Sequence, residues 1–366
     1  MSRTAVIILN WNGEQKGLIR RYLPSVVKNT PKEVAEVVVA DNGSTDKSLQ
    51  LLKEEFPSVK VIPLDKNYGF AEGYNQAIDI ITELKQEELR SPSGNVFEVH
   101  RMESPDYVVL LNDDVRVPEG WLEPMIAFLD SHPNCAALQP KILKDGNEQM
   151  FEYAGACGGY LDNLCFPYCR GRIFDTVEED MGQYDLPEGE AWPVMWASGA
   201  CLLIRTELYM KAGGLDRRFY AHMEEIDLCW RLRRMGYDIV CVPQSKVYHL
   251  GGASLPQGNP KKTKLNFRNN ILMMWKNLPA DQYKHLLRRR KFLDGVAAAN
   301  FLRQGQFRNF KAVYDAHREA EKMIAEQYTA AELIGFGTAK PFLQQQFSIL
   351  WKYFKKGIKR YSDLGL

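Results

Sequence analysis

The sequence predicts an α/β fold: an open sheet of strands that alternate with helices, with a ligand site along its carboxyl edge. Two observations support this prediction. Short runs rich in β-branched residues recur along the chain, separated by segments whose apolar residues follow helical spacing. Several of these runs end in clusters of polar or acidic residues. In open α/β sheets, such clusters at neighbouring strand ends form ligand sites.

The predicted elements follow one another in a regular order. We expect strands at residues 5–9, 34–40, 59–63, 107–111, 198–204 and 239–247. We expect helices after the second and third strands, the latter ending near Leu84, then at 224–235 and from 256 to the C-terminus. Residues 85–105 are predicted to form a surface excursion, and residues 140–192 a substrate-facing region without a second regular sheet.

Composition and charge exclude several classes of protein. The chain has 366 residues, of which 45% are hydrophobic, so it is not predominantly disordered. A net charge of +1 gives no reason to expect a nucleic-acid partner. Residues 256–366 hold 21 basic and 8 acidic residues (+13), which leaves 26 basic and 38 acidic residues (−12) in 1–255. An acidic body therefore precedes a basic tail.

Seven cysteines in a chain of 366 residues form no disulfide framework, which favours a reducing compartment. Cys157, Cys165 and Cys169 lack the second cysteine pair or histidine pair of a zinc site. The apolar run at 5–9 is too short for a secretory signal, and no run approaches the ~18 apolar residues of a membrane span. We therefore expect a cytoplasmic protein without a transmembrane helix.

Four polar clusters lie at predicted strand or loop ends. They are Asp41 with Asp46, Asn112-Asp113-Asp114, Glu224-Glu225-x-Asp227, and His249. Each cluster alone has an ordinary structural explanation, such as a turn, a solvated loop, a helix-start acid or a buried imidazole. Together at one sheet edge, the four clusters indicate a functional site.

Seven segments resemble glycosyltransferase family 2, the inverting nucleotide-sugar transferases with the GT-A fold. They are VIILNWNG, VVVADNGSTD, NYGFAEGYN, YVVLLNDDV, SGACLLIRTELYMKAGGLD, HMEEIDLCWRLRRMGY and VYHLGG. Within the family, the chain is most similar to rhamnosyltransferases and other bacterial surface-polysaccharide enzymes. The resemblance implies a Rossmann-like open mixed sheet flanked by helices, with a C-terminal helical extension.

The resemblance also implies a division of the chain. Residues 1–255 would form the catalytic domain, with about 1–114 binding the nucleotide-sugar and 115–255 binding the acceptor. Residues 256–366 would form a basic helical region.

The metal ligands implied by the resemblance are Asn112, Asp114 and His249. Asn112-x-Asp114 stands in the place of the family's D-x-D motif with its first Asp replaced by Asn, so Asp114 is the expected direct ligand. Oxygen ligands suit Mg²⁺ or Mn²⁺, and an imidazole favours Mn²⁺ somewhat. A divalent cation would offset the charge gained by the departing nucleoside diphosphate.

The resemblance assigns a larger set of residues to the donor. They are Asn10, Trp11, Asn12, Asp41, Asn67, Gly69, Asn75 and Asp113. Asp41 resembles the residue that accepts the N3–H of uracil or thymine, and Asp113 would reach the ribose or a metal-bound water. Trp11 offers a flat face to the base or ribose, with core packing as the alternative.

The resemblance implies that Glu225 is the general base, because Glu224-Glu225-Ile-Asp227 resembles the family's E-D-x-D-L segment, whose second acid is the usual base. An inverting transfer needs such a carboxylate to take the proton of the acceptor hydroxyl. Glu224 is the rival, since neighbouring helical positions point in different directions. Asp227 is expected to pair with Arg231, four residues on, and to be structural.

The end of the basic tail has amphipathic spacing. On a helix, one face would hold Leu343, Phe347, Leu350, Phe354, Ile358 and Tyr361, and the opposite face Lys352, Lys355, Lys356 and Lys359. A second basic cluster lies at 284–291. A helix on an anionic membrane and a helix packed on the catalytic body both remain open.

The sequence thus predicts a metal-dependent transfer of sugar from a UDP- or dTDP-activated donor to a glycan or lipid-linked glycan acceptor, at the inner face of the cell membrane. The alternatives are a nucleotidyltransferase and a non-catalytic sugar-nucleotide-binding relative. The first normally has a Gly-rich basic loop after strand one, which Asn-Trp-Asn-Gly replaces here. The second is motivated by Asn112. A dehydrogenase is disfavoured because no G-x-G-x-x-G follows a strand.

Overall fold

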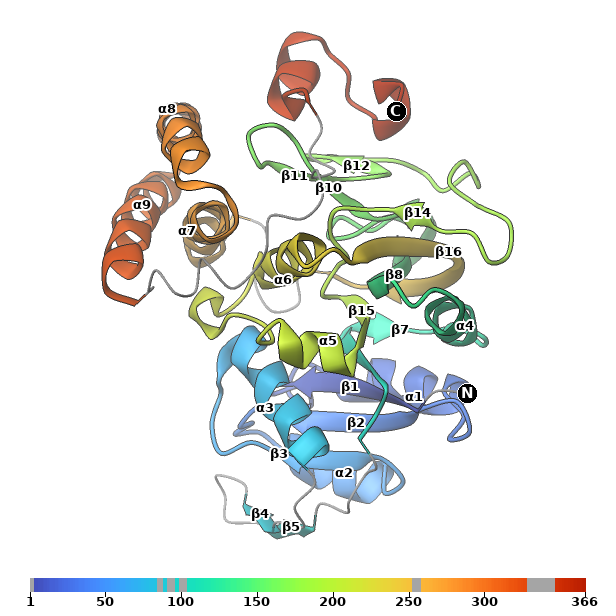
Figure 1. Ribbon diagram of the computed structural model, residues 1–366. Helices are drawn as coiled ribbons and strands as arrows, with labels where there is room; N and C mark the ends of the chain where they lie inside the picture. The colour runs from blue at the N-terminus through green and yellow to red at the C-terminus, as the bar shows by residue number, and fades with distance from the viewer. Residues whose placement is uncertain (1–2, 84–87, 91–95, 99–103, 252–257, 328–345) are drawn as a thin grey trace.

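The computed structural model describes residues 3–83, 88–90, 96–98, 104–251, 258–327 and 346–366, which include a ten-stranded mixed sheet (Figure 1). The main path runs β14-β16-β8-β15-β6-β1-β2-β3, with β7 paired to β16 and β9 to β8. The strands are β1 (Thr4–Asn10), β2 (Glu36–Asp41), β3 (Lys60–Pro63), β6 (Tyr107–Asn112), β7 (Val115–Arg116), β8 (Cys135–Lys144), β9 (Asn147–Phe151), β14 (Trp192–Pro193), β15 (Cys201–Arg205) and β16 (Asp238–His249).

All six strands predicted from the sequence lie in this sheet. β1, β2, β3 and β6 are parallel, and β15 runs antiparallel to β6 and β8. β8 was not predicted, because Gln139, Pro140 and Lys141 interrupt its apolar pattern. Gln139 and Lys141 are nevertheless fully buried. The buried ammonium of Lys141 is bound by the carboxylates of Asp180 and Asp185.

Helices cover both faces of the sheet, because successive side chains of a strand point to opposite sides. Ile7 belongs to the hydrophobic core on the side of α3 and α6, and Ile8 to the core on the side of α1 and α4. The helices of the first 251 residues are α1 (Leu18–Asn29), α2 (Ser48–Glu55), α3 (Gly69–Glu83), α4 (Glu123–Ser131), α5 (Thr206–Lys211) and α6 (Glu224–Arg234).

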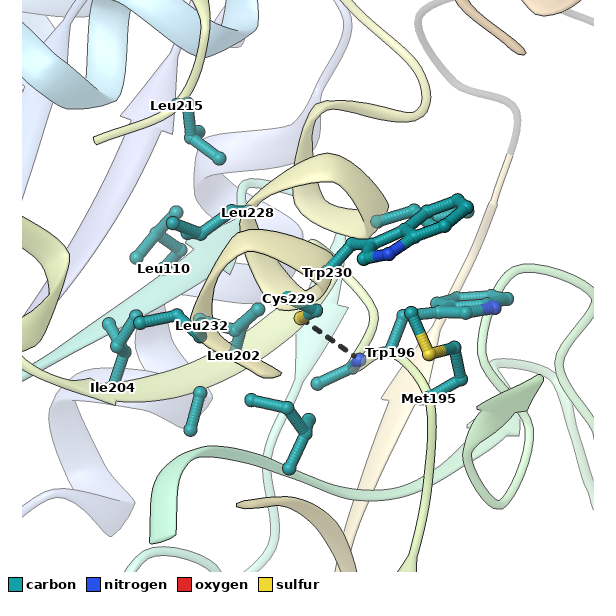
Figure 2. Close-up of a cluster of buried hydrophobic side chains, with 14 of the residues drawn as sticks. Leu110, Met195, Trp196, Leu202, Ile204, Leu215, Leu228, Cys229, Trp230 and Leu232 are labelled. Carbon is teal, nitrogen blue, oxygen red and sulfur yellow. Dashed lines mark hydrogen bonds between the residues drawn. The ribbon is translucent and has the colours of Figure 1, made fainter. Parts of the chain in front are cut away.

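Helix α6 lies firmly against the sheet. Figure 2 shows Leu228 of α6 beside Leu110 of β6 and Leu202 of β15, and all three side chains are fully buried. The Cys229 thiol accepts a hydrogen bond from the backbone N–H of Ala197 at 3.4 Å (Figure 2). These contacts hold the start of α6, which carries Glu224 and Glu225, at the edge of the sheet.

The region after Pro140 contains a second regular sheet, so the expectation of none was wrong. Its four short antiparallel strands are β10 (Gly159–Leu161), β11 (Pro167–Cys169), β12 (Arg172–Ile173) and β13 (Thr176–Val177). Strands of two or three residues are too short for periodicity to reveal. Much of the predicted excursion at 85–105 lies outside the described residues, which there form only the hairpin β4 (Glu88–Arg90) and β5 (Val96–Glu98).

The C-terminal extension begins with three long helices, as predicted. They are α7 (Pro260–Asn277), α8 (Ala280–Arg303) and α9 (Phe307–Gln327). In Figure 1, α7 lies next to α6, while α8 and α9 lie further out.

A buried ionic cluster joins α7 to α6 and the segment before it. The ammonium of Lys276 lies 2.7 Å from a carboxylate oxygen of Asp227 in α6 and 2.7 Å from one of Asp216. The expected pair of Asp227 with Arg231 is present at 2.8 Å. Although burial opposes it, these cations hold the pKa of Asp227 below its ordinary value. The cluster therefore stabilises the fold above pH ~4, the ordinary carboxyl pKa, and loses this effect in acid.

The last segment, 346–366, does not form the predicted amphipathic helix. It contains a π-helical turn (Trp351–Lys355) and a 3₁₀ turn (Tyr361–Leu364). Tyr361 is buried and its ring lies 5.8 Å from that of Tyr160 in β10, centroid to centroid. The segment thus packs on the second sheet through aromatic side chains. It lies against the body of the protein, as one of the two alternatives expected, but it is not the amphipathic helix that both alternatives assumed. Leu343 lies outside the described residues.

Two further expectations concern the chain as a whole. Every cysteine is a free, buried thiol, and the Cys157 and Cys241 sulfurs are 3.7 Å apart. Within the described segments, no helix combines the length and the apolar character that a membrane crossing requires.

We predict that Lys276→Met lowers the free energy of unfolding by about 3–5 kcal/mol, because Asp216 and Asp227 would lose a buried counter-ion. Urea denaturation would measure the change. The matched control is Lys291→Met, which removes an exposed ion pair with Glu321 and should cost no more than ~1 kcal/mol. Equal effects of the two substitutions would contradict the prediction.

Candidate functional site

The carboxyl ends of three parallel strands bring the first polar groups together. Asn10 of β1 lies opposite Asp41 of β2, and Asn112 of β6 lies opposite Leu9. The side-chain amide of Asn10 donates to Asp41 Oδ2 at 2.8 Å. These polar residues therefore meet at one edge of the sheet, as predicted.

Asp41 is fully buried, and burial raises its pKa above the ordinary value. Its Oδ1 accepts the backbone N–H of Ser44 at 2.9 Å, while Asn10 occupies Oδ2. Because each carboxylate oxygen has two lone pairs, Asp41 still has capacity for another donor. Its contact with a pyrimidine base remains a prediction.

Trp11 and Asn12 form the loop that leaves β1. Trp11 is 43% exposed, so core packing does not account for it, and the Lys16 ammonium lies 4.8 Å from its ring centroid. Asn12 has a left-handed φ of 51°. Two hydrogen bonds hold Asn12 in place. Its backbone N–H donates to Ser44 Oγ (2.9 Å), and its Oδ1 accepts the backbone N–H of Thr45 (2.8 Å).

Asn67 and Gly69 determine how α3 begins. Asn67 Oδ1 accepts the Gly69 N–H at 2.8 Å, and the Asn42 amide donates to the Gly69 carbonyl at 2.9 Å. Gly69 has a φ of +80°, and a Cβ there would stand 2.6 Å from the ring of Tyr220. Glycine is therefore required because the 220 loop crosses the start of α3. Asn42, which the sequence analysis did not select, contributes to the same turn.

Asn75 is engaged elsewhere. Its Oδ1 accepts the Tyr209 hydroxyl at 2.6 Å and the Leu215 N–H at 3.0 Å, and its amide donates to the Leu215 carbonyl at 2.8 Å. These bonds hold the turn after α5. They do not join Asn75 to the other candidate residues, so its donor-binding role is an untested prediction.

His249 reaches the acidic turn after β6 through strand pairing. β7 follows Asp114 directly, and its Val115 lies opposite His249 at the end of β16. His249 Nε2 is consequently 3.0 Å from Asp114 Oδ1 and 3.4 Å from the Asn112 amide nitrogen. The three predicted metal ligands, Asn112, Asp114 and His249, therefore lie together.

The charges of this cluster are strongly coupled. Burial and the Asp114 carboxylate raise the pKa of Asp113 to about 7. Burial alone would lower the pKa of His249, but the carboxylates of Asp114 and Glu152 outweigh it and raise that pKa to about 10. His249 in turn holds the pKa of Asp114 below its ordinary value against the effect of burial. The imidazole therefore carries positive charge between two carboxylates.

The donor set suits a hard divalent cation. Across the described chain there is no group of three or more His, Cys, Asp or Glu side chains that could hold a metal ion. Asn112 Oδ1 is buried, and no donor among the described residues satisfies it. With Asp114 and His249 beside it, this acceptor fits a cation that takes only part of its ligands from protein, as Mg²⁺ does in phosphate sites. The residues therefore fit a metal shared with a substrate phosphate.

Glu152 is a site residue that the sequence analysis missed. Its Oε2 lies 3.4 Å from His249 Nδ1 and accepts the Ala154 N–H at 2.5 Å. A Cβ at Gly251 would stand 2.6 Å from its Oε1, so the first glycine after the histidine makes room for it. Gly251, two residues after His249 in the sequence, could have indicated that another group approaches the histidine. The sequence around Glu152 contains no motif that identifies it.

The first turn of α6 presents two unneutralised carboxyl groups. Oε2 of Glu224 and Oε2 of Glu225 are buried, and no described residue donates to either. Burial raises the pKa of Glu225 to about 7. Burial and then the neighbouring Glu225 raise the pKa of Glu224 well above its ordinary value. Near neutral pH, Glu225 can therefore exchange a proton.

The Glu225 side chain begins beside the backbone that precedes β15. Its Cβ is 3.7 Å from the position of a Cβ on Gly199, and the next residue, Ala200, accepts the Asn112 N–H at 3.1 Å. One tight turn thus lies between Glu225 and Asn112. The choice between Glu225 and Glu224 as the base stays a prediction.

The loop before α6 has an unusual backbone. Tyr220, His222 and Met223 all have left-handed φ values, of 66°, 71° and 73°. Such values cost energy in residues other than glycine and persist only where surrounding contacts impose them. The Tyr220 carbonyl accepts the N–H of Phe70 in α3 at 2.9 Å, so this loop joins the start of α3 to the start of α6.

Two residues of α7 hold that loop from the other side. The buried Asn269 amide donates to the carbonyls of Phe219 (3.0 Å), Ala221 (2.9 Å) and His222 (2.6 Å). Arg268 also donates to the Phe219 carbonyl, at 2.8 Å. The C-terminal helices therefore help to position Glu224 and Glu225, which the sequence did not reveal.

Residues 5–209, more than half of the chain, match the profile of Glycosyl transferase family 2. The chain is 28% identical over 235 residues to the N-acetylglucosaminyl-diphospho-decaprenol L-rhamnosyltransferase of Mycobacterium tuberculosis (strain ATCC 25618 / H37Rv), covering 63% of this chain and 71% of the relative. It is 23% identical over 154 residues to rhamnosyltransferase WbbL of Escherichia coli (strain K12), covering 42% of this chain and 56% of the relative.

Among solved structures, the chain is similar to GalNAc-T7 with UDP, GalNAc and Mn²⁺, with a TM-score of 0.55 and 17% identity. The match covers 90% of this chain and 58% of that one, so this chain spans less than two thirds of the solved relative. This likeness shows the fold, which is the GT-A fold expected from the sequence.

We predict that Asn269→Ala accelerates hydrogen exchange at the backbone amides of residues 217–223 and costs about 1–3 kcal/mol of stability, because buried carbonyls lose their donor. Exchange measured by mass spectrometry and urea unfolding would test this. Asn270→Ala is the matched control: Asn270 is equally buried in the same helix but donates to the Cys165 carbonyl. Unchanged exchange at 217–223 in Asn269→Ala would contradict the assignment.

Proposed function

The chain belongs to Glycosyl transferase family 2 and is a glycosyltransferase, and from this premise we propose that it moves a sugar from a UDP- or dTDP-activated donor to an acceptor hydroxyl with inversion. Family membership decides against the nucleotidyltransferase alternative. The proposal makes the chain an active enzyme rather than a non-catalytic relative that only binds a sugar nucleotide.

The observation that carries this proposal is the meeting of Asp114 with His249, 3.0 Å apart, beside the partnerless buried oxygen of Asn112. A replaced first Asp would argue for lost activity if nothing compensated for it. The Asn112 amide oxygen remains available in the same place, and two carboxylates flank the histidine.

Donor binding would use the loops after β1 and β2. Trp11 is exposed enough to offer its face to the base or ribose, and Asn10 keeps Asp41 in place through its amide. Asp41 would accept the N3–H of a uracil or thymine ring. Asp113 would reach the ribose or a metal-bound water. The solved relative of the same fold contains UDP, which supports a pyrimidine nucleotide here.

Asp114, His249 and Asn112 would hold Mn²⁺ or Mg²⁺ together with the donor diphosphate. The cation supplies charge stabilisation for the departing nucleoside diphosphate. To bind the cation, His249 must first lose the proton that the carboxylates of Asp114 and Glu152 stabilise on its ring. Glu152, whose Oε2 lies 3.4 Å from the other ring nitrogen, would then accept a hydrogen bond from that nitrogen and orient the imidazole.

Glu225 would act as the general base. An inverting transfer is a single displacement, so the carboxylate must take the hydroxyl proton of the acceptor as that oxygen attacks the anomeric carbon. Burial sets the Glu225 pKa near 7, which makes its carboxylate both available and basic at neutral pH. The loop bonds from Asn269 and α3 limit its movement.

For the acceptor, we favour a lipid-linked glycan in bacterial surface polysaccharide or cell-wall synthesis, at the inner face of the cell membrane. The first of the two rhamnosyltransferase relatives is named for an acceptor carried on diphospho-decaprenol. The net charge of +13 in residues 256–366 supports peripheral contact with anionic lipid.

A transfer assay tests the function. Purified chain would be incubated with Mn²⁺, a UDP- or dTDP-sugar from a panel, and a glycan-diphospho-lipid acceptor, and the products would be analysed by mass spectrometry. A glycosylated acceptor of inverted anomeric configuration supports the proposal. Tight donor binding without transfer or hydrolysis across the panel would favour the non-catalytic relative.

We predict that Mn²⁺ strengthens UDP or dTDP binding by about 10- to 100-fold, and that Asp114→Ala removes this gain, because the cation would lose its carboxylate ligand. Calorimetry with Mn²⁺ or EDTA would measure it. His249→Ala should weaken the metal effect less, since carboxylate and phosphate ligands remain. Equal affinities for wild type and Asp114→Ala in both conditions would remove the metal from the proposal.

We predict that Glu225→Gln keeps donor affinity but lowers kcat by about 10²-fold or more, because the base is lost. For the wild type, kcat/KM should rise as the pH increases through about 7, where Glu225 loses its proton. Glu224→Gln is the control, and it should retain most of the turnover and the same rising limb. If Glu224→Gln alone lost turnover, the assignment would move one residue.

A further inference from the structure

Exposed apolar side chains gather on the outer side of α8 and α9. Of thirteen exposed large hydrophobic side chains in the described structure, six lie on these two helices or at their ends. They are Phe292 (72% exposed), Val296 (55%), Leu302 (43%), Phe307 (67%), Phe310 (40%) and Tyr314 (59%). Single exposed apolar residues need no explanation, but a group of six in one helix pair does.

The exposed side chains of α9 form one stripe on the side of that helix opposite α7. On α9, Phe307, Phe310 and Tyr314 are spaced by three and four residues and share one side of the helix. The opposite side carries Ala316 and Ala320, which are fully buried where α9 packs on α7. On α8, Phe292 and Val296 are exposed on the side opposite the buried Asp294, and Phe292 borders an open hollow beside Leu164 and Ser348. The outer position of both helices is visible in Figure 1.

The distribution of charged residues on α8 and α9 is also uneven. Residues 280–327 hold ten Lys and Arg against six Asp and Glu, a net of +4. Two of the acids turn inward: Asp294 is buried beside Arg290, and Glu319 pairs with Lys264 and Arg268 of α7. Exposed arginines, by contrast, flank the apolar stripes on both helices, at positions 288, 289, 303 and 308. The other four acids, at positions 281, 315, 321 and 326, are not buried, but nine exposed Lys and Arg outnumber them. The exposed surface of α8 and α9 is therefore aromatic with a net positive charge.

We propose that this outer side of α8 and α9 is the surface through which the enzyme lies on an anionic membrane. Aromatic rings suit the headgroup and acyl boundary, while arginines beside them remain at the level of the phosphates. A second copy of the chain is the less favourable occupant. A twofold contact would bring the same positive surface against itself.

The inference deepens the proposed function and rests on its membrane-linked acceptor. It also moves the membrane contact away from residues 346–366, where Tyr361 and Leu364 are buried. In that segment, Trp351 and Phe354 are 56% and 67% exposed, and four lysines surround them. Because residues 346–366 also combine exposed aromatic rings with lysines, they provide a control surface for the vesicle-binding test of α8 and α9.

Co-sedimentation of the full chain with vesicles tests the proposal. Vesicles of phosphatidylcholine alone would be compared with vesicles containing 30% phosphatidylglycerol, each at low and high salt. We expect binding to the anionic vesicles that weakens at high salt through screening. Phe307→Ser with Phe310→Ser should reduce that binding by about 10-fold or more, because two inserted rings are lost.

Trp351→Ser with Phe354→Ser is the matched control, equal in number of aromatic side chains and similar in exposure, and it should bind like wild type. Circular dichroism would verify that both double variants fold. No binding of the wild type to anionic vesicles, or a loss confined to the 351/354 variant, would overturn the proposal. The wild type could instead form a dimer that Phe307→Ser with Phe310→Ser abolishes while vesicle binding is unchanged. That result would assign the surface to a second copy of the chain and would also overturn the proposal. The assay contains neither donor nor acceptor, so its result stands apart from any failure of sugar transfer.

Discussion

The buried carboxylate of Asp227 links the two parts of the molecule on which the site depends. It accepts Arg231 of its own helix and Lys276 of α7, and Asn277 donates to its other oxygen at 2.8 Å. A carboxylate this deep is tolerated only because cations and hydrogen-bond donors surround it. The same bonds fix the position of α7 against α6. They therefore also fix the positions of Arg268 and Asn269, which belong to α7, and of the helices that follow it.

The position of α7 then constrains the loop that leads to the candidate base. Non-glycine residues at left-handed φ would relax to a different path if the loop were free. Asn269 holds its carbonyls on one side, and the first N–H groups of α3 hold the Tyr220 carbonyl on the other. Gly69 is part of the same constraint, because any side chain there would displace Tyr220. The start of α3, the start of α6 and the C-terminal helices are thus connected through one loop.

Electrostatics divide the protein in a related way. The acidic body concentrates Asp113, Asp114 and Glu152 around one imidazole, an arrangement that favours positive charge on His249 or a cation in its place. In the basic region, Lys276 and Arg290 are buried against acids and serve the fold. Arg268 is buried as well, while most of the other basic residues described in this region are exposed. The charge of the C-terminal region therefore has a structural part and a surface part.

The sequence by itself determined the parallel strands and the polar residues at their ends, because a buried run followed by Asn10, Asp41 or Asn112 is a local pattern. It also identified Asp227 as structural from the spacing to Arg231. Only the tertiary structure decided that β7 would bring His249 to Asp114, and that Asn269 would hold the base loop. It also decided that residues 346–366 would pack on a second sheet. These outcomes depend on pairings between residues far apart in the chain, whose energies no local periodicity contains.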